Sequence, residues 1–130
     1  MASLMTKQQA FGLPALKLAF IGDTICDLLA RTELMFTDLQ VRNMHASATG
    51  MVNAKAQAGQ LERIRHLLDT DEQDIILRAR NAHPGHTIPH TASREEYMAA
   101  TGFEALMGYL YLTGQMLRAQ KLFELSKIKE

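Results

Sequence analysis

The sequence has few of the features that mark secreted, membrane or strongly basic proteins. A single cysteine, Cys26, among 130 residues excludes an internal disulfide and favours a reducing cytoplasm. No apolar run approaches the roughly 20 residues that span a bilayer, and the first residues carry no secretion signal, so we expect a cytoplasmic protein with no membrane contact. Fourteen basic and fourteen acidic residues cancel, so the net charge does not by itself indicate a polyanion partner.

Length and hydrophobic periodicity predict one all-α domain, a helical bundle that comprises residues 1–130. Pro14 suits a helix start, Thr37 and Asn53 can cap the next two helices, and residues 70–73 (TDEQ) and 93–96 (SREE) match the capping-box pattern. Helices are expected over about 15–34, 37–50 and 53–68, from near 71, from near 94 to Gly114, and over about 115–128.

Two acidic residues interrupt apolar helical patterns. Asp23 lies in FIGDTICDLLAR and Glu104 in TGFEALMGYLYLT. Two carboxylates from separate helices are the minimum set that can hold a hard divalent cation such as Mg²⁺. The alternative is structural: Asp23 is then a partly exposed acid one turn from Asp27, and Glu104 is paired with an arginine.

Residues 75–93 form a basic stretch: they contain arginines and histidines but no carboxylate. Binding to phosphates is expected to concentrate here, although a solvated loop after a helix that ends in two arginines is an equal alternative. The loop HPGHTIPHT is expected to be irregular, and its loose histidine spacing, its prolines and the lack of cysteine disfavour a zinc site. The basic side chains are Arg78, Arg80, His83, His86, His90 and, just after the stretch, Arg94.

Small residues in these helices indicate close packing. Gly102 and Gly108 weaken a helix by roughly 1 kcal/mol each relative to alanine, so their use is predicted to be close backbone contact. Cys26 lies among apolar residues in the middle of a helix and is predicted to pack in the core, without a reactive thiol.

Several short motifs, taken in order, resemble the ribonuclease III catalytic domain. FIGDTICDL (residues 20–28) and GFEALMGYLYL (residues 102–112) are similar to its two signature segments. The Mini-III branch, which lacks a double-stranded-RNA-binding domain, is resembled more closely through Arg31, His45, NAKAQA (53–58), DEQDI (71–75) and RARNA (78–82). The resemblance runs from about residue 15 to 114.

The resemblance implies a metal site with fewer acids than the larger enzymes have. Asp23 and Glu104 stand at metal-ligating positions of the family, and they are therefore the implied catalytic residues. Ala19 and Thr101 replace two further acidic ligands of full-length ribonuclease III, which puts a two-metal arrangement in doubt. Asp27 is either an outer-shell acid or, more simply, a helix-surface residue. Ala79 departs from the glycine expected in RARNA.

The implied activity is hydrolysis of phosphodiesters in double-stranded RNA by water that Mg²⁺ activates, with Mn²⁺ as a possible substitute. The products would carry 5′-phosphate and 3′-hydroxyl ends, and the implied substrate is a large-subunit (23S) ribosomal RNA precursor. Family members are homodimers, and Phe20 is the candidate interface residue here. The candidate RNA contacts are Lys55, Arg78, Arg80, Asn81, His83 and His86.

Two other functions compete with this one. A non-catalytic helical dimer that binds structured RNA or a ribosome-assembly partner is consistent with the missing acidic ligands. The retained Asp23 and Glu104 argue against it. An all-α metal phosphohydrolase acting on nucleotides is disfavoured, because the adjacent His-Asp pair of one such group and the paired-glutamate motif of another are both absent.

Overall fold

The computed structural model describes residues 2–82 and 92–128, and the regular secondary structure in those ranges is entirely helical. The predicted all-α class is therefore confirmed. Within these ranges no helix combines the length and the apolar character that a bilayer span requires. The elements are α1 (Lys7–Phe11), α2 (Ala15–Leu34), α3 (Val41–Val52), α4 (Ala54–Ile64), the 3₁₀ turn η1 (Arg65–Leu67), α5 (Thr70–Asn81), α6 (Arg94–Leu112) and α7 (Met116–Leu125).

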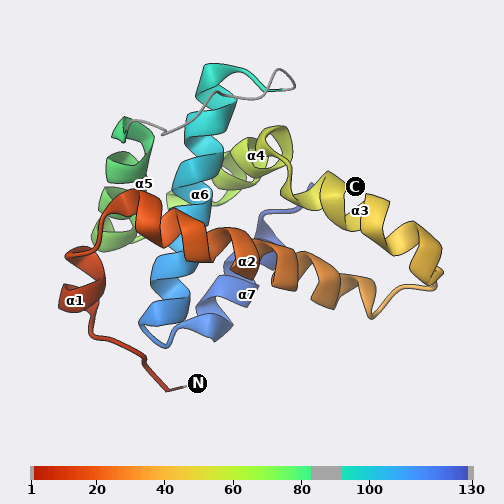
Figure 1. Cartoon of the computed structure of the whole chain (residues 1–130), viewed down its shortest axis with the longest axis horizontal. Helices are drawn as coiled ribbons and strands as arrows, with labels where there is room; N and C mark the ends of the chain where they lie inside the picture. Colours follow the sequence, from red (N-terminus) through yellow and green to blue (C-terminus); the bar gives the residue numbers. More distant parts are fainter. Residues whose placement is uncertain (1, 83–91, 129–130) are drawn as a thin grey trace.

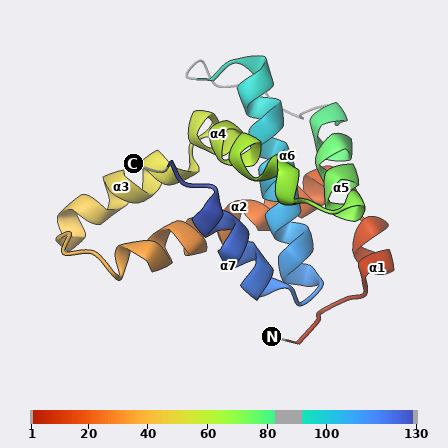
Figure 2. The same ribbon diagram turned by 180° about the vertical axis from the view of Figure 1, so that it is seen from behind.

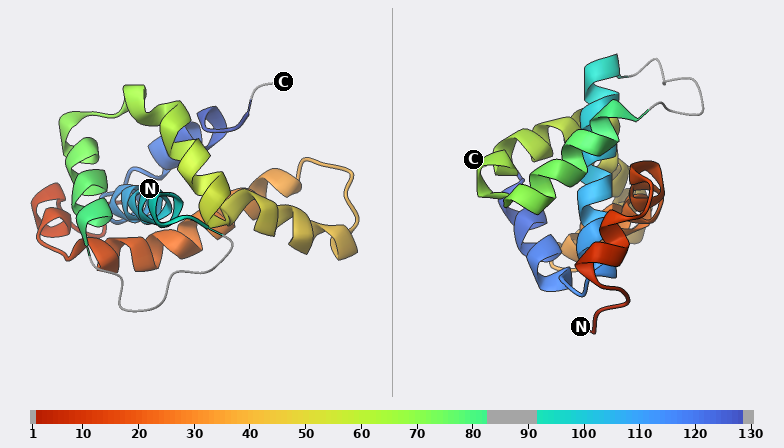
Figure 3. Two further views of the ribbon diagram at one scale, coloured as in Figure 1. Left: turned by 90° about the horizontal axis from the view of Figure 1, so that it is seen from above. Right: turned by 90° about the vertical axis from the view of Figure 1, so that its left-hand side faces the viewer.

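Helix α6 forms the centre of the fold. It runs through the middle of the molecule, with α2, α4 and α5 packed around it (Figure 1 and Figure 3). Every residue from Ala99 to Leu110 is buried except Glu104. A helix that is buried on all sides must be predominantly apolar, so a carboxylate in this stretch requires a specific partner.

Helix α2 crosses α6 at very short range because glycines stand at the contact. A Cβ atom on Gly108 would lie 2.1 Å from the carbonyl oxygen of Leu18, and one on Gly22 would lie 1.7 Å from the carbonyl oxygen of Glu104. No larger residue fits at these positions, so the backbones themselves are in contact. Close packing is confirmed for Gly108 and also for Gly102, where a Cβ would lie 3.1 Å from Ile76 Cγ2.

The C-terminal half of α2 and helix α3 form an arm that extends away from α6 (Figure 1). Of the residues in α3, only Ala48 is buried. Residues just after α7 contact α2 and α4: Lys127 forms an ion pair with Glu33 of α2, and the Arg63 Nε of α4 donates to the carbonyl oxygen of Ser126. Helices α4 and α7 cover the side of α6 that faces the viewer in Figure 2.

The short helix α1 is an element that the hydrophobic pattern did not predict. It starts with a capping box, in which the Thr6 hydroxyl accepts from the Gln9 amide and the Gln9 side chain accepts from the Thr6 amide. Phe11 packs edge-to-face on Tyr109 of α6, with ring centroids 5.7 Å apart, and the Arg78 guanidinium lies 5.6 Å from the Phe11 ring centroid. The Thr-x-x-Gln spacing is the signal that would have indicated this helix.

Two predicted helix caps were wrong. Thr37 does not cap the second helix, because α3 begins only at Val41 and the Thr37 hydroxyl donates instead to a carbonyl at the end of α2. Helix α5 is capped by Asp69, whose capping-box partner is Glu72, one residue before the expected pair in residues 70–73. Aspartate and threonine are both good caps, so local chemistry alone did not choose between the two registers.

Other predicted boundaries are confirmed. The first long helix spans the expected residues 15–34, Asn53 accepts from the Ala56 amide at the start of α4, and Ser93 and Glu96 form the expected capping box. Gly114 follows α6 with φ of 77°, a left-handed conformation that only glycine adopts without strain, and so it ends the helix.

Glu72 also forms a buried ion pair that joins α5 to α7. Its side chain is 1% exposed, and its two oxygens accept from Arg118 at 2.5 and 2.7 Å. Arg118 donates in addition to the carbonyl oxygen of Leu67 at 3.1 Å. The charge of this buried glutamate is therefore compensated within the chain.

Candidate active site

Asp23 of α2 and Glu104 of α6 meet where the two helices cross. The backbone contact of Gly22 with Glu104 brings the neighbouring Asp23 close enough to raise the pKa of the Glu104 side chain. Asp23 is exposed, and Glu104 is half-buried. The structure therefore brings together the two acids singled out in the sequence, one at the surface and one just beneath it.

The electrostatic environment of Glu104 disfavours its ionised form. Burial, then the hydrogen bond and the negative charge of Asp23, raise the pKa of Glu104 to about 8. The nearby side-chain amide of Gln57 opposes this effect and lowers the pKa. Within residues 2–82 and 92–128, neither carboxylate forms a salt bridge with a basic side chain. Two carboxyl groups are thus held together, and no basic side chain of the described residues compensates them.

This arrangement fits a divalent cation, which would neutralise both acids at once. The donors are carboxylate oxygens, which are the ligands that Mg²⁺ and Mn²⁺ prefer. No group of three or more histidine, cysteine, aspartate or glutamate side chains gathers at one point in the described part of the chain. The two carboxylates suffice for Mg²⁺, because this ion keeps several of its waters and binds to proteins through one or two carboxylates.

Beneath the two acids lie the side chains of Cys26 and Gln57, both buried. Burial, followed by the charges of Glu104 and Asp23, raises the pKa of the Cys26 thiol, so the thiol stays protonated and unreactive. The predicted core position of Cys26 is confirmed. Ala19 and Thr101, which replace two acids of the larger enzymes, are also buried, so no further carboxylate enters from these positions.

The candidate RNA contacts lie on different parts of the surface. Lys55 is exposed in the first turn of α4, and Asn81 is exposed at the end of α5 beside the half-buried Arg80. Arg78 is occupied within the chain, because it donates to the carbonyl oxygen of Leu13 at 2.8 Å and covers the Phe11 ring. The remaining candidates, His83 and His86, lie outside the described residues, as does His90.

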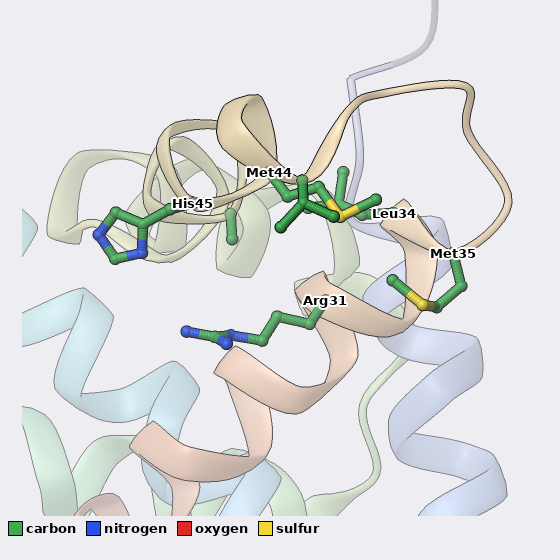
Figure 4. A pocket seen from close by; sticks show the side chains of 7 residues that line it. Arg31, Leu34, Met35, Met44 and His45 are labelled. Atoms are coloured by element: carbon green, nitrogen blue, oxygen red, sulfur yellow. The ribbon is translucent and has the colours of Figure 1, made fainter.

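A separate crevice of about 220 Å³ lies between α2 and α3 in the arm. Arg31 and His45, two residues of the Mini-III-like pattern, line it, and Figure 4 shows both side chains extending to the same side of the crevice. Arg31 Nε is 3.1 Å from the Asp27 carboxylate, so Asp27 forms an exposed ion pair on the helix surface. The other residues that line the crevice are Leu34, Met35, Val41, Met44 and Ala48.

Three residues of the site were not identified from the sequence as part of it. Gly22 sets the approach of the two helices, and Gln57 contacts Glu104 from α4. Tyr97 lies close enough for the charge of Glu104 to add to the effect of burial in raising its pKa. Gln57 belongs to the NAKAQA segment, so the motif did contain it, but helical spacing alone does not indicate which of its polar residues point inward.

Comparisons with known proteins agree with this arrangement. Residues 16–115 match the ribonuclease III domain family. The chain is 43% identical to the Mini-ribonuclease 3 of Thermoanaerobacter sp. (strain X514) over 124 residues, which are 95% of this chain and 87% of the relative. It is 42% identical to the Mini-ribonuclease 3 of Symbiobacterium thermophilum over 113 residues, 86% of each chain.

A solved structure has the same fold. The crystal structure of protein FN1578 from Fusobacterium nucleatum superposes with a TM-score of 0.79 at 29% identity, and the match covers 87% of this chain and 90% of that one. The family match covers more than half of the chain, and the relatives are similar along most of their length. The chain therefore belongs to the ribonuclease III family of endoribonucleases.

Proposed function

We propose that this protein is a Mg²⁺-dependent endoribonuclease that hydrolyses phosphodiesters in double-stranded RNA and leaves 5′-phosphate and 3′-hydroxyl ends. Mn²⁺ is expected to replace Mg²⁺. The observation that carries the proposal is the meeting of Asp23 and Glu104, from two separate helices, with no basic side chain of the described ranges paired to either. Similarity to proteins named Mini-ribonuclease 3 supports the same activity.

In this proposal Asp23 and Glu104 hold the cation. A bound divalent ion would lower the pKa of a water molecule and supply positive charge to the phosphate that is attacked. Glu104 must lose its proton to bind the ion, and the half-buried position of its side chain then limits the water that competes for its oxygens. The Cys26 thiol does not act as the nucleophile, since it is buried and its raised pKa keeps it protonated.

We also propose that the protein acts as a homodimer. One chain offers one carboxylate pair, and cleavage of both strands of a duplex requires two. Phe20 on α2 is 80% exposed, and Leu16, one turn earlier, is exposed as well. An exposed phenylalanine beside another apolar side chain is typical of a surface that a partner covers, and a second copy of this chain would bring a second site close to the first.

The proposed substrate is a precursor of large-subunit (23S) ribosomal RNA, which is what the resemblance to the Mini-III branch implies. A-form RNA is recognised mainly by shape and phosphate contacts, so exposed basic and amide groups suffice for binding. Lys55, Arg80 and Asn81 supply such groups in the described residues. Arg78 is a weaker candidate, because its contacts to Leu13 and Phe11 already account for its position. We further propose a single domain and a cytoplasmic location.

A non-catalytic dimer that binds structured RNA or a ribosome-assembly partner is the second candidate. The small buried residues Ala19 and Thr101, which stand where the larger enzymes have acids, favour it. A metal-dependent cleavage assay separates the two. Purified protein is incubated with Mg²⁺ and duplex RNA, beside single-stranded RNA, duplex DNA and free nucleotides. Cleavage of duplex RNA alone, abolished by a chelator, is expected. Duplex binding without any cleavage at saturating Mg²⁺ would favour the second candidate.

A further inference from the structure

A buried amide faces the two acids from the third helix that surrounds the site. Gln57 lies in the second turn of α4, and its side chain is 2% exposed. Its Nε2 atom is buried and completes no hydrogen bond of normal geometry with a group of the described chain. The side chain nevertheless lies within reach of both Glu104 and Cys26. A buried donor without a full partner is unfavourable, so this amide requires an explanation.

We propose that Gln57 is a positioning residue: its Nε2 donates to one oxygen of the Glu104 carboxylate and turns the other oxygen toward the cation shared with Asp23. This inference rests on the proposed function, because it requires Glu104 to be a metal ligand. Ligating carboxylates are commonly held by a hydrogen bond from a second protein group, which fixes their orientation.

The surroundings of Gln57 favour a donor that is neutral. A lysine or arginine at this position would neutralise Glu104 by itself and compete with the cation, whereas an amide orients the carboxylate and leaves its charge available. The close contact of Gly22 with the Glu104 backbone fixes the other end of the same residue. With its backbone held by α2 and its side chain by α4, Glu104 is directed at Asp23 before any cation arrives, which lowers the ordering cost of binding.

A neighbouring glutamine provides a matched control. Gln60 lies one turn later on α4 and is also buried, but its Nε2 donates to the carbonyl oxygen of Met51 at 2.8 Å and so serves the packing of α3 on α4. Gln57→Met and Gln60→Met each replace a buried amide by an apolar side chain of similar length. Both variants remove a buried polar side chain from α4, but only Gln57→Met removes the proposed hydrogen bond to Glu104.

The test measures Mn²⁺ affinity in the absence of RNA, by electron paramagnetic resonance of the free ion. Gln57→Met is expected to weaken Mn²⁺ binding about 10- to 100-fold, as loss of a group that orients a metal ligand usually does, and Gln60→Met to leave it unchanged. Cleavage by Gln57→Met should recover when Mn²⁺ is raised, while KM for the duplex stays constant. Unchanged Mn²⁺ affinity in a folded Gln57→Met protein would overturn the assignment, and so would an equal loss in Gln60→Met.

A second measurement decides the matter if Gln57→Met fails to fold. In the parent protein labelled with ¹⁵N, the side-chain amide signals of Gln57 should shift when Mg²⁺ is added and when Glu104 is replaced by Gln. Signals that respond to neither change would show that the amide does not bond to Glu104. Failure of the proposed function itself gives a different result, because Glu104→Gln would then bind Mn²⁺ as the parent does.

Discussion

Two glutamates lie inside this small helical protein, and they have opposite partners. Glu72 is fully buried, and its oxygens accept from the Arg118 guanidinium and from the backbone amide of Asp69 at the start of α5. Glu104 is half-buried and meets another acid, Asp23, together with a single amide from Gln57. Arg118 neutralises Glu72, whereas Glu104 has another acid beside it and no basic partner among the described residues.

The partners of the two glutamates indicate that Glu72 has a structural role and that Glu104 is a candidate functional residue. A buried charge is tolerated when its partners compensate it, as those of Glu72 do. A divalent cation would supply the positive charge that the two acids at the crossing of α2 and α6 lack. Carboxyl groups with strongly shifted pKa values are found most often at functional sites. Burial alone does not distinguish the two glutamates, since the more deeply buried one has the structural role.

Removing the partner of Glu72 should produce the largest loss of stability. Arg118→Met leaves a fully buried carboxylate without a cation, and we expect the free energy of unfolding to fall by about 3 kcal/mol. Urea denaturation followed by circular dichroism measures the change. Lys127→Met, which breaks the more exposed pair with Glu33, is the control and should cost less than about 1 kcal/mol. Equal effects would remove the contrast between buried and surface pairs.

Replacing either acid of the other site should instead affect activity. Asp23→Asn and Glu104→Gln are each expected to reduce cleavage of duplex RNA by about 10²-fold, because a metal site then loses one of its two carboxylates. Helix content, measured by circular dichroism, and binding of duplex RNA should stay close to those of the parent. A variant that retains more than a few per cent of the parent rate would remove its residue from the site.

The close crossing of α2 and α6 can be broken at Gly22. An alanine there would place Cβ 1.7 Å from the carbonyl oxygen of Glu104, so the helices must separate, and we expect a loss of about 2 kcal/mol in stability. The cleavage rate should fall by more than the loss of folded protein explains, because Glu104 moves away from Asp23. Gly50→Ala on α3 is the control, because nothing lies within 4 Å of its Cβ, and it should gain up to about 1 kcal/mol. Thermal unfolding and initial cleavage rates measure both effects.

Local patterns in the sequence predicted the helices well, because each of their signals acts within a few residues. The span 15–34 and the caps at Asn53 and Ser93 depend on periodicity and on side-chain contacts to the nearest turn. The cap of α5 lies one residue earlier than predicted, because aspartate and threonine both cap helices well and the capping box forms between Asp69 and Glu72.

The two acids of the candidate site could be singled out from the sequence, but the residues around them could not. Asp23 and Glu104 were singled out because a charge in an apolar helical pattern is unusual, and that signal is present in the chain itself. Gly22 and Gln57 act across helix contacts, so their importance depends on where α2 and α4 approach α6. No local rule distinguishes Gln57 from Gln60, although one faces the acids and the other the carbonyl of Met51.

The smallest effect that we predict is a dependence of stability on pH that Glu104 confers in the absence of metal. Its pKa in the folded protein is raised to about 8, whereas in the unfolded chain it returns to its ordinary value of 4.5. Below about pH 4.5 both states hold the proton and Glu104 costs nothing. As the pH rises from there towards 8, the unfolded chain ionises first, so the folded state loses stability.

This contribution is isolated by comparing the parent with Glu104→Gln in the presence of a chelator. The free energy of unfolding of the variant should equal that of the parent near pH 5 and exceed it by about 1 kcal/mol at pH 8.5. This figure is reduced because solvent reaches the half-buried side chain and screens its charge. Chemical denaturation at the two pH values gives the difference. Added Mg²⁺ should reverse the order at pH 8.5, because only the parent then gains the free energy of binding. A variant that is no more stable than the parent at pH 8.5 without metal would mean that burial and Asp23 do not destabilise ionised Glu104, and that Glu104 resembles Glu72 after all.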